Sequence, residues 1–293
     1  MSNPLSRILC SIFTVVCAAV CIGVAAQTAG KYRFHCDRDT VEVGEMLDAL
    51  MSHRDEPVGS LVLAAARLLE DRPYVAGSLE DDEEKVVIDV DGLDCVTFVE
   101  NCYALALTVR SGGRSWREFA RNIESLRYRH GIAGGYDTRL HYTTEWINDN
   151  VYRGNVTDVT PALPDARALT KSLYFMTHNR GLYPALADDS VYNLRRDIEM
   201  GLRSMRLPYI TKEMTKNKGV VALLRDGDMV SFLSTRDGLD SDHVALLRIE
   251  DGRVYIVHAS SSEGKVTFDK STLYDYLKYR KRDCPGVRVV RLQ

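Results

Sequence analysis

A cysteine stands where a turn gives way to an apolar helix, within residues 87–107. Asp91-Gly92 is a turn signal, and Asp94 is a residue type that commonly caps a helix. Cys95 then falls at about the first helical position. Because the dipole and the unpaired N–H groups of a helix start favour a thiolate, this position predicts a lowered thiol pKa and a nucleophile. A nucleophilic thiol also needs a base, which must come from elsewhere in the chain.

Two histidines, His243 and His258, are the candidates for that base. They lie in segments predicted to be strands, and Asp251-Gly252 between them is a strong signal for a two-residue hairpin turn. With such a turn, His243 and His258 share one face of the sheet with Ala245 and Ser260. The two histidines are then diagonal neighbours, roughly 7–8 Å apart at the backbone, within reach of two imidazole rings.

The shared face depends on the register of the hairpin. A two-residue turn pairs Glu250 with Arg253, whereas a slip of one residue would put the two histidines on opposite faces. With the predicted register, one imidazole can take the thiol proton while the second fixes its tautomer. The alternatives are two structural histidines, or a zinc site made by Cys95, His243 and His258. No CxxC, HxH or HExxH spacing supports zinc.

The pattern of predicted elements changes along the chain. Helices are predicted at residues 41–51, 61–69, 116–127, 163–176 and 191–205, with a short strand at 86–88. Strands are predicted at 220–224, 229–233, 244–249, 254–259, 266–268 and 287–291, with a helix at 272–278. A helical half (about 40–215) followed by an antiparallel sheet half (about 219–293) predicts an α+β fold.

Charge and the N-terminal segment narrow the class of protein. The 293-residue chain has a net charge of −3 and no basic stripe with interleaved aromatics, so nucleic acid is not an expected partner. Arg7 is followed by an apolar run at 8–26 that ends in Val24-Ala25-Ala26, a pattern typical of a signal peptide. We therefore expect a signal peptide at 1–26, a single catalytic domain at 27–293 and a periplasmic location. A membrane anchor is the alternative, since the run has nearly the length of a span.

Four cysteines follow the predicted signal peptide. Cys95 and Cys102 are seven residues apart on one predicted helix, roughly 10 Å along its axis, so they cannot form a disulfide. Cys102 is predicted to be a small buried hydrophobic residue. Cys36 and Cys284 could join the two ends of the domain, although nothing in the sequence demands this bond.

Five stretches, in this order, resemble one protein family. They are PYVAGSLE (73–80), DCVTFVEN (94–101), RLHYTTEWI (139–147), GLDSDHV (238–244) and HASS (258–261). The order of cysteine, histidine and polar strand residue resembles that of the NlpC/P60 cysteine peptidases, which have a papain-like core. The five stretches together are most similar to the N-acetylmuramoyl-L-alanine amidase-like branch, which was first catalogued as a family of unknown function.

The resemblance implies a nucleophile helix packed on an antiparallel sheet, with extra N-terminal helices. It implies that Cys95 is the nucleophile, His243 the base and His258 the orienting residue, with no metal or organic cofactor. The implied substrates are peptidoglycan fragments (muropeptides), preferably 1,6-anhydro-muropeptides, cut between N-acetylmuramic acid and L-alanine during cell-wall turnover or recycling. We expect a monomer that has no stable membrane partner after the signal peptide is removed.

The resemblance also suggests five substrate contacts, which are Tyr74, Asp94, Arg139, His141 and Tyr142. Ordinary packed aromatic residues and a structural loop histidine are the alternatives for the two tyrosines and for His141. In the family, the base histidine is usually followed by Val-Gly. This chain has His243-Val244-Ala245 instead, and Ala245 adds a methyl group on the face of the histidines.

Three other functions remain open at this stage. One is an endopeptidase that cuts within the stem peptide, because the choice of bond depends on pocket shape. Another is a muropeptide-binding protein without activity, which the intact set of cysteine and two histidines disfavours. The last is a transglutaminase-like acyl transferase, in which an aspartate would be expected in place of His258.

Overall fold

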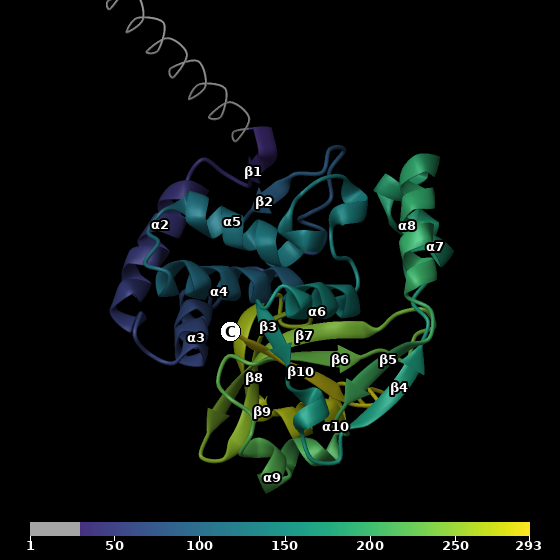
Figure 1. The fold of residues 1–293 in the computed structure, drawn as a ribbon. Helices are drawn as coiled ribbons and strands as arrows, with labels where there is room; N and C mark the ends of the chain where they lie inside the picture. The colour runs from purple at the N-terminus through teal and green to yellow at the C-terminus, as the bar shows by residue number, and fades with distance from the viewer. Residues whose placement is uncertain (1–29) are drawn as a thin grey trace, which may run out of the picture.

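The computed structural model describes residues 30–293, so the predicted signal peptide lies outside the described residues. Within them, helices cover one face of a six-stranded antiparallel sheet, and shorter helices cover the other face (Figure 1). The chain therefore has the mixed helix-and-sheet fold that the sequence predicts. No helix in residues 30–293 is long and apolar enough to cross a membrane.

Helix α4 (Cys95–Arg110) lies at the centre of the helical layer. Three helices flank it: α2 (Asp39–Leu50), α3 (Val58–Leu68) and α5 (Trp116–Arg127). Most residues of α4 are buried, which explains why its apolar residues are not confined to one stripe. Tyr103 attaches the helix to the sheet, because its hydroxyl donates to Gly227 O at 3.1 Å and accepts from Met229 N at 3.0 Å.

The main sheet has the strand order β3-β10-β6-β7-β8-β9. Its strands are β3 (Val156–Asp158), β6 (Met229–Leu233), β7 (Ser241–Glu250), β8 (Arg253–Ser260), β9 (Lys265–Thr272) and β10 (Val287–Leu292). Asp251 and Gly252 both have positive φ and form the two-residue turn between β7 and β8. Glu250 pairs with Arg253, so the predicted register is confirmed.

The two faces of the sheet pack against different layers. Val244 and Val257 belong to the core cluster that also contains α4, whereas Ala245 and Ile256 belong to the cluster on the opposite face. The second face is covered by α9 (Lys218–Val221) and α10 (Leu273–Tyr279). Because side chains alternate along a strand, His243 and His258 lie on the α10 face, as Ala245 does. The registered β7–β8 pairs end at Leu246↔Val257, so the histidines lie beyond the paired region.

Some predicted elements are wrong. Residues 163–176 were expected to be helical, yet they contain strand β4 (Arg167–Lys171) and the start of the short helix α7 (Phe175–His178). The helix expected at 191–205 is α8 (Asp189–Gly201), which ends before β5 (Met205–Tyr209). β4 and β5 pair in a separate sheet, so their conformation depends on a partner distant in the sequence.

The strand expected at 220–224 is also wrong, because this segment begins inside the helical turn α9 and contains no strand. Asn217 precedes the turn, and its side-chain oxygen accepts hydrogen bonds from Gly219 N and Val220 N. This capping favours a helix start over an extended strand. Three further elements are the short strand β1 (Tyr32–Phe34), its parallel partner β2 (Val86–Ile88), and helix α6 (Thr143–Tyr152).

A buried ion pair joins α6 to α8. Arg195 is fully buried, and its Nη2 donates to Glu145 Oε2 at 2.7 Å. Glu145 also accepts from Arg129 Nη2 at 2.6 Å and from the backbone N–H of Tyr142 at 3.1 Å. One carboxylate therefore pairs with two guanidinium groups and caps α6.

We expect Glu145→Gln to lower the free energy of unfolding by about 3 kcal/mol, because the variant leaves the buried Arg195 with only the more distant Glu199 carboxylate, 3.9 Å from its Nε. Urea unfolding followed by circular dichroism measures this loss. Asp48→Asn is the matched control, since Asp48 pairs with Arg114 on the surface and such pairs contribute about 1 kcal/mol or less. An equal loss in the two variants would contradict the role of the buried pair.

Candidate active site

Cys95 is the first residue of α4, and Asp94 caps that helix as predicted. The Asp94 carboxylate accepts hydrogen bonds from Val96 N at 2.9 Å and from Thr97 N at 2.8 Å. Thr97 Oγ1 accepts in return from Asp94 N at 2.9 Å, which completes a capping box. The cap holds the first turn of α4 and therefore the backbone of Cys95 in one position.

His243 and His258 lie side by side, as the hairpin register predicts. Nε2 of His243 is 2.7 Å from Nδ1 of His258, which is a hydrogen-bond distance. The Phe232 ring centroid lies 5.4 Å from that of His243, and Tyr276 packs edge-on against His258 at 5.5 Å. His258 is only 1% exposed, so packing holds its ring in place.

One cavity, of about 660 Å³, brings the thiol and the two imidazoles together. Cys95, His243 and His258 all line it. The rest of its wall is polar, charged or aromatic: Tyr74, Asp242, Ser260, Ser261, Ser262, Glu263, Tyr276, Arg280 and Lys281. The structure therefore places a nucleophile type, a base type and a second imidazole around one space that a polar substrate could enter.

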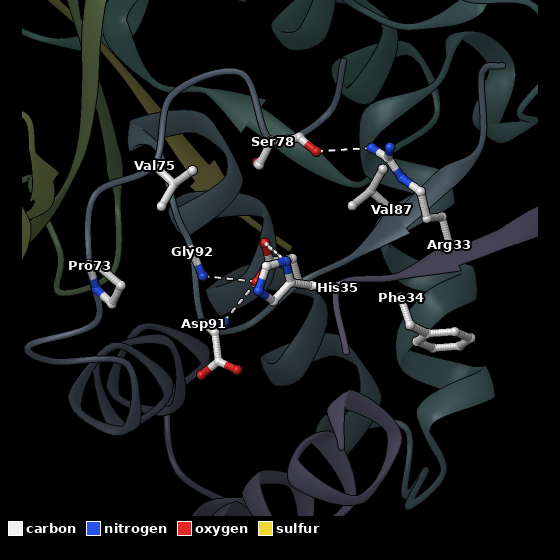
Figure 2. A pocket seen from close by; sticks show the side chains of 10 residues that line it. Arg33, Phe34, His35, Pro73, Val75, Ser78, Val87, Asp91 and Gly92 are labelled. Atoms are coloured by element: carbon white, nitrogen blue, oxygen red, sulfur yellow. Dashed lines mark hydrogen bonds and ion pairs between the residues drawn. The ribbon is translucent and has the colours of Figure 1, made fainter. Parts of the chain in front are cut away.

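Tyr74 reaches this cavity from the loop that follows α3, as expected for a residue beside Cys95. Its backbone N–H donates to Gly264 O at 2.8 Å, and it forms a parallel bridge with Leu93. Its neighbours Pro73 and Val75 instead line a second cavity of about 390 Å³, next to β1 (Figure 2). The alternation of side chains along this extended segment thus directs Tyr74 to the cavity of the thiol.

The electrostatics of the thiol differ from the prediction based on helix position. Burial, followed by the Asp94 carboxylate, raises the pKa of Cys95 to about 12, although the N–H groups of Val244 and Cys95 and the charge of Lys281 oppose the rise. The predicted lowering of the thiol pKa is therefore wrong. Loss of hydration outweighs the helix start, and the cap itself brings a negative charge beside the sulfur.

His243, the candidate base, is also kept neutral. Burial, followed by the charge of His258, lowers the pKa of His243 well below its usual value. At neutral pH the free site consequently holds a neutral thiol and a neutral imidazole. Such a pair supports general-base catalysis, in which the proton moves as the sulfur attacks.

Two of the expected substrate contacts, Arg139 and Tyr142, line no part of the Cys95 cavity. Arg139 is buried and pairs with Glu80 at 2.8 Å and with Glu84 at 3.4 Å. Tyr142 is buried too, and its hydroxyl donates to Glu199 at 2.7 Å. Both side chains hold neighbouring segments together, and a direct contact with substrate stays a prediction for each.

The remaining expected contacts, His141 and Asp94, are also outside the lining of the Cys95 cavity. His141 lies in a small adjacent cavity with Val96 and Glu100, and its Nε2 is 2.8 Å from Tyr136 O. Burial lowers the pKa of His141 well below its usual value, so it is neutral at neutral pH. Asp94 serves as the helix cap described above. A role in substrate binding stays a prediction for both.

Two residues next to the site, Asp269 and Arg280, were missed in the sequence. Asp269 Oδ2 lies 3.8 Å from His258 Nε2 and 3.3 Å from Arg280 Nη1. The only sequence feature that could have predicted Asp269 as a neighbour of His258 is the register between β8 and β9. In that register, His258 pairs with Thr267. Asp269 is two residues further and therefore on the same face, but no turn signal as clear as Asp251-Gly252 sets that register.

Within residues 30–293, the cysteines outside the site are Cys36, Cys102 and Cys284, and all three are free. Cys36 Sγ donates to Asp39 Oδ1 at 3.4 Å, and Cys284 Sγ donates to Gly286 O at 3.1 Å. The disulfide considered between Cys36 and Cys284 is therefore not formed. Cys102 is fully buried within the core around α4, as predicted.

We expect alkylation of Cys95 by iodoacetamide to keep accelerating as the pH rises through 9 and 10, because a pKa of about 12 leaves little thiolate at lower pH. Asp94→Asn should shift the profile to lower pH, since asparagine also caps a helix but carries no charge. Peptide mass spectrometry after timed labelling distinguishes Cys95 from the other cysteines. A labelling plateau by pH 8 in the unaltered protein would contradict the raised thiol pKa.

Solved structures similar to this chain include a crystal structure of an N-acetylmuramoyl-L-alanine amidase from Bacteroides uniformis. It is 34% identical with a TM-score of 0.74, and the match covers 80% of this chain and 99% of that chain. A Bacteroides fragilis protein, provisionally described as a xylanase, is also 34% identical, with a TM-score of 0.72 and coverage of 78% and 100%. A Legionella pneumophila protein, 19% identical with a TM-score of 0.63 over 85% and 93%, shares the fold.

A comparison with curated proteins found no match. The family model described as AmiA-like, N-acetylmuramoyl-L-alanine amidase-like, matches residues 64–286. This range contains Tyr74, Cys95, His243 and His258 and covers most of the chain. The chain therefore belongs to the N-acetylmuramoyl-L-alanine amidase-like family.

Proposed function

We propose that this chain is a cysteine-dependent amidase of the NlpC/P60 superfamily. It hydrolyses the amide between N-acetylmuramic acid and L-alanine in peptidoglycan fragments, with 1,6-anhydro-muropeptides as the preferred substrates. The observation that carries the proposal is the single cavity that holds Cys95, His243 and His258, with the imidazoles 2.7 Å apart. Family membership and the similarity to the Bacteroides uniformis amidase support the choice of bond.

The reaction begins with a neutral thiol. As the Cys95 sulfur attacks the amide carbonyl, His243 takes the thiol proton, and negative charge develops on the carbonyl oxygen. The backbone N–H of Cys95, at the start of α4, can stabilise that oxygen. The low pKa of His243 suits this order of events, because the imidazolium becomes favourable only when negative charge forms beside it.

The second half returns the enzyme to its starting state. His243 donates its proton to the alanine nitrogen, the C–N bond breaks, and the peptide leaves a thioester on Cys95. Water then loses a proton to His243 and attacks the thioester, the C–S bond breaks, and His243 returns that proton to the Cys95 sulfur. The muramic acid carboxyl group gives its own proton to solvent and leaves as a carboxylate. Each proton that His243 gains is donated again in the following step. The proposed cycle therefore consists of proton transfers and acyl transfer alone, and it includes no cofactor.

The charges around the cavity suit a peptide that carries carboxylates. Arg280 pairs with Glu263 at 3.2 Å, and Asp242 pairs with Arg236 at 3.7 Å. Lys281 lines the cavity and has no ion-pair partner within residues 30–293. Its ammonium group is therefore available to a carboxylate of the stem peptide.

The cellular setting belongs to the same proposal. The signal pattern at 1–26 supports export to the periplasm, where products of glycan turnover arise. A soluble fragment, rather than intact cell wall, suits a cavity of about 660 Å³. We propose that the protein acts there as a monomer in cell-wall turnover or recycling.

We expect the purified protein to convert GlcNAc-anhydroMurNAc-tetrapeptide into free tetrapeptide and intact disaccharide, as read by mass spectrometry. Cys95→Ala should abolish the products, because it removes the nucleophile, and His243→Ala should lower kcat by roughly 100-fold or more. Cys36→Ala, a change of a thiol outside the cavity, is the matched control and should retain full activity.

Other products would identify the other functions. A Cys95-dependent dipeptide would indicate an endopeptidase, and transfer to an added amine in preference to water would indicate an acyl transferase. Binding of the muropeptide without cleavage would indicate a binding protein. Any of these results would overturn the amidase proposal.

A further inference from the structure

A buried carboxylate faces the side of His258 that points away from His243. Nε2 of His258 lies 3.8 Å from Asp269 Oδ2, within ion-pair distance but longer than a hydrogen bond. Within residues 30–293, no other group hydrogen-bonds to this buried nitrogen. His258 thus lies between His243, which bonds to its Nδ1, and Asp269, which faces its Nε2.

Asp269 is held firmly in this position. It is only 4% exposed, on β9, and its Oδ1 accepts a hydrogen bond from Ser271 N at 2.7 Å. Burial opposes its ionisation, but contacts with His258 and Ser271 and the charge of Arg280 lower its pKa to about 2. The side chain is therefore a carboxylate throughout the neutral pH range and can accept hydrogen bonds but not donate them.

The hydrogen bond between the two imidazoles can form in two ways. In one, His243 donates from Nε2 to Nδ1 of His258, which leaves Nδ1 of His243 without a proton. In the other, His258 donates from Nδ1, and Nδ1 of His243 then carries the proton. The 2.7 Å distance is compatible with both, but only the first leaves a lone pair on the His243 nitrogen that points away from His258.

We propose that Asp269 is a positioning residue that selects the first arrangement and so makes His243 a base. The carboxylate favours a proton on Nε2 of His258. Nδ1 of His258 is then a hydrogen-bond acceptor and takes the proton of His243 Nε2, while Nδ1 of His243 stays free for the thiol proton. The order of action is Asp269, His258, His243, Cys95, and it rests on the proposed function for the identity of His243 as the base.

The decisive variant is Asp269→Asn, which keeps the shape of the side chain and can donate an N–H to His258 Nε2. We expect kcat for the muropeptide to fall roughly 100-fold or more while KM stays within about twofold. The ¹⁵N spectrum of His258 should change from the Nε2–H to the Nδ1–H tautomer. Asp251→Asn, the same chemical change in the exposed hairpin turn, is the matched control and should alter neither measurement.

Two measurements, the ¹⁵N spectrum of His258 and the labelling of Cys95, need no substrate. They therefore test this inference separately from the proposed function. Labelling of Cys95 by iodoacetamide at pH 8 should slow about tenfold in Asp269→Asn, since His243 no longer takes the thiol proton. If Asp269→Asn does not fold, the ¹⁵N spectra of the unaltered protein and of Asp269→Glu still test the inference. Both proteins should show the Nε2–H tautomer of His258. An Nδ1–H tautomer in the unaltered protein, or unchanged labelling in a folded Asp269→Asn, overturns the inference. Failure to cleave muropeptides alone overturns only the proposed substrate.

Discussion

Burial of helix α4 is the constraint on which the rest of the structure depends. Helices pack on one side of it and the sheet on the other, and the Tyr103 hydroxyl bonds to the segment that leads into β6. The helix therefore cannot slide, and Cys95 at its start has one position relative to β7 and β8. A nucleophile carried by a buried helix is placed more precisely than one carried by a loop, where the backbone retains freedom.

The same burial determines the chemical state of the site. Removal from water favours the neutral forms of Cys95 and His243, and it does so more strongly than the helix start favours a thiolate. On the proposed mechanism, charge then develops only during attack, when the helix N–H and the paired imidazoles can stabilise it. A neutral thiol in the resting state is also less prone to adventitious oxidation and alkylation, which suits the exported enzyme proposed above.

Particular residues show how far local signals reach. The Asp251-Gly252 turn lies between its two strands, so it sets their register, and the meeting of His243 with His258 followed from it. The cap formed by Asp94 is equally local. By contrast, residues 167–171 have no local reason to be a strand and become one because β5 pairs with them from more than thirty residues away.

The sequence by itself thus determined the helix start that carries Cys95, the hairpin that carries the two histidines, and the mixed helical and antiparallel character of the fold. Each of these depends on neighbouring residues. Only the tertiary structure decided the raised pKa of the thiol, the burial of Arg139 and Tyr142 in structural contacts, and the approach of Asp269 to His258. The physical reason is that hydration is lost through packing, and that β8 and β9 acquire their register by pairing, neither of which the order of residues states directly.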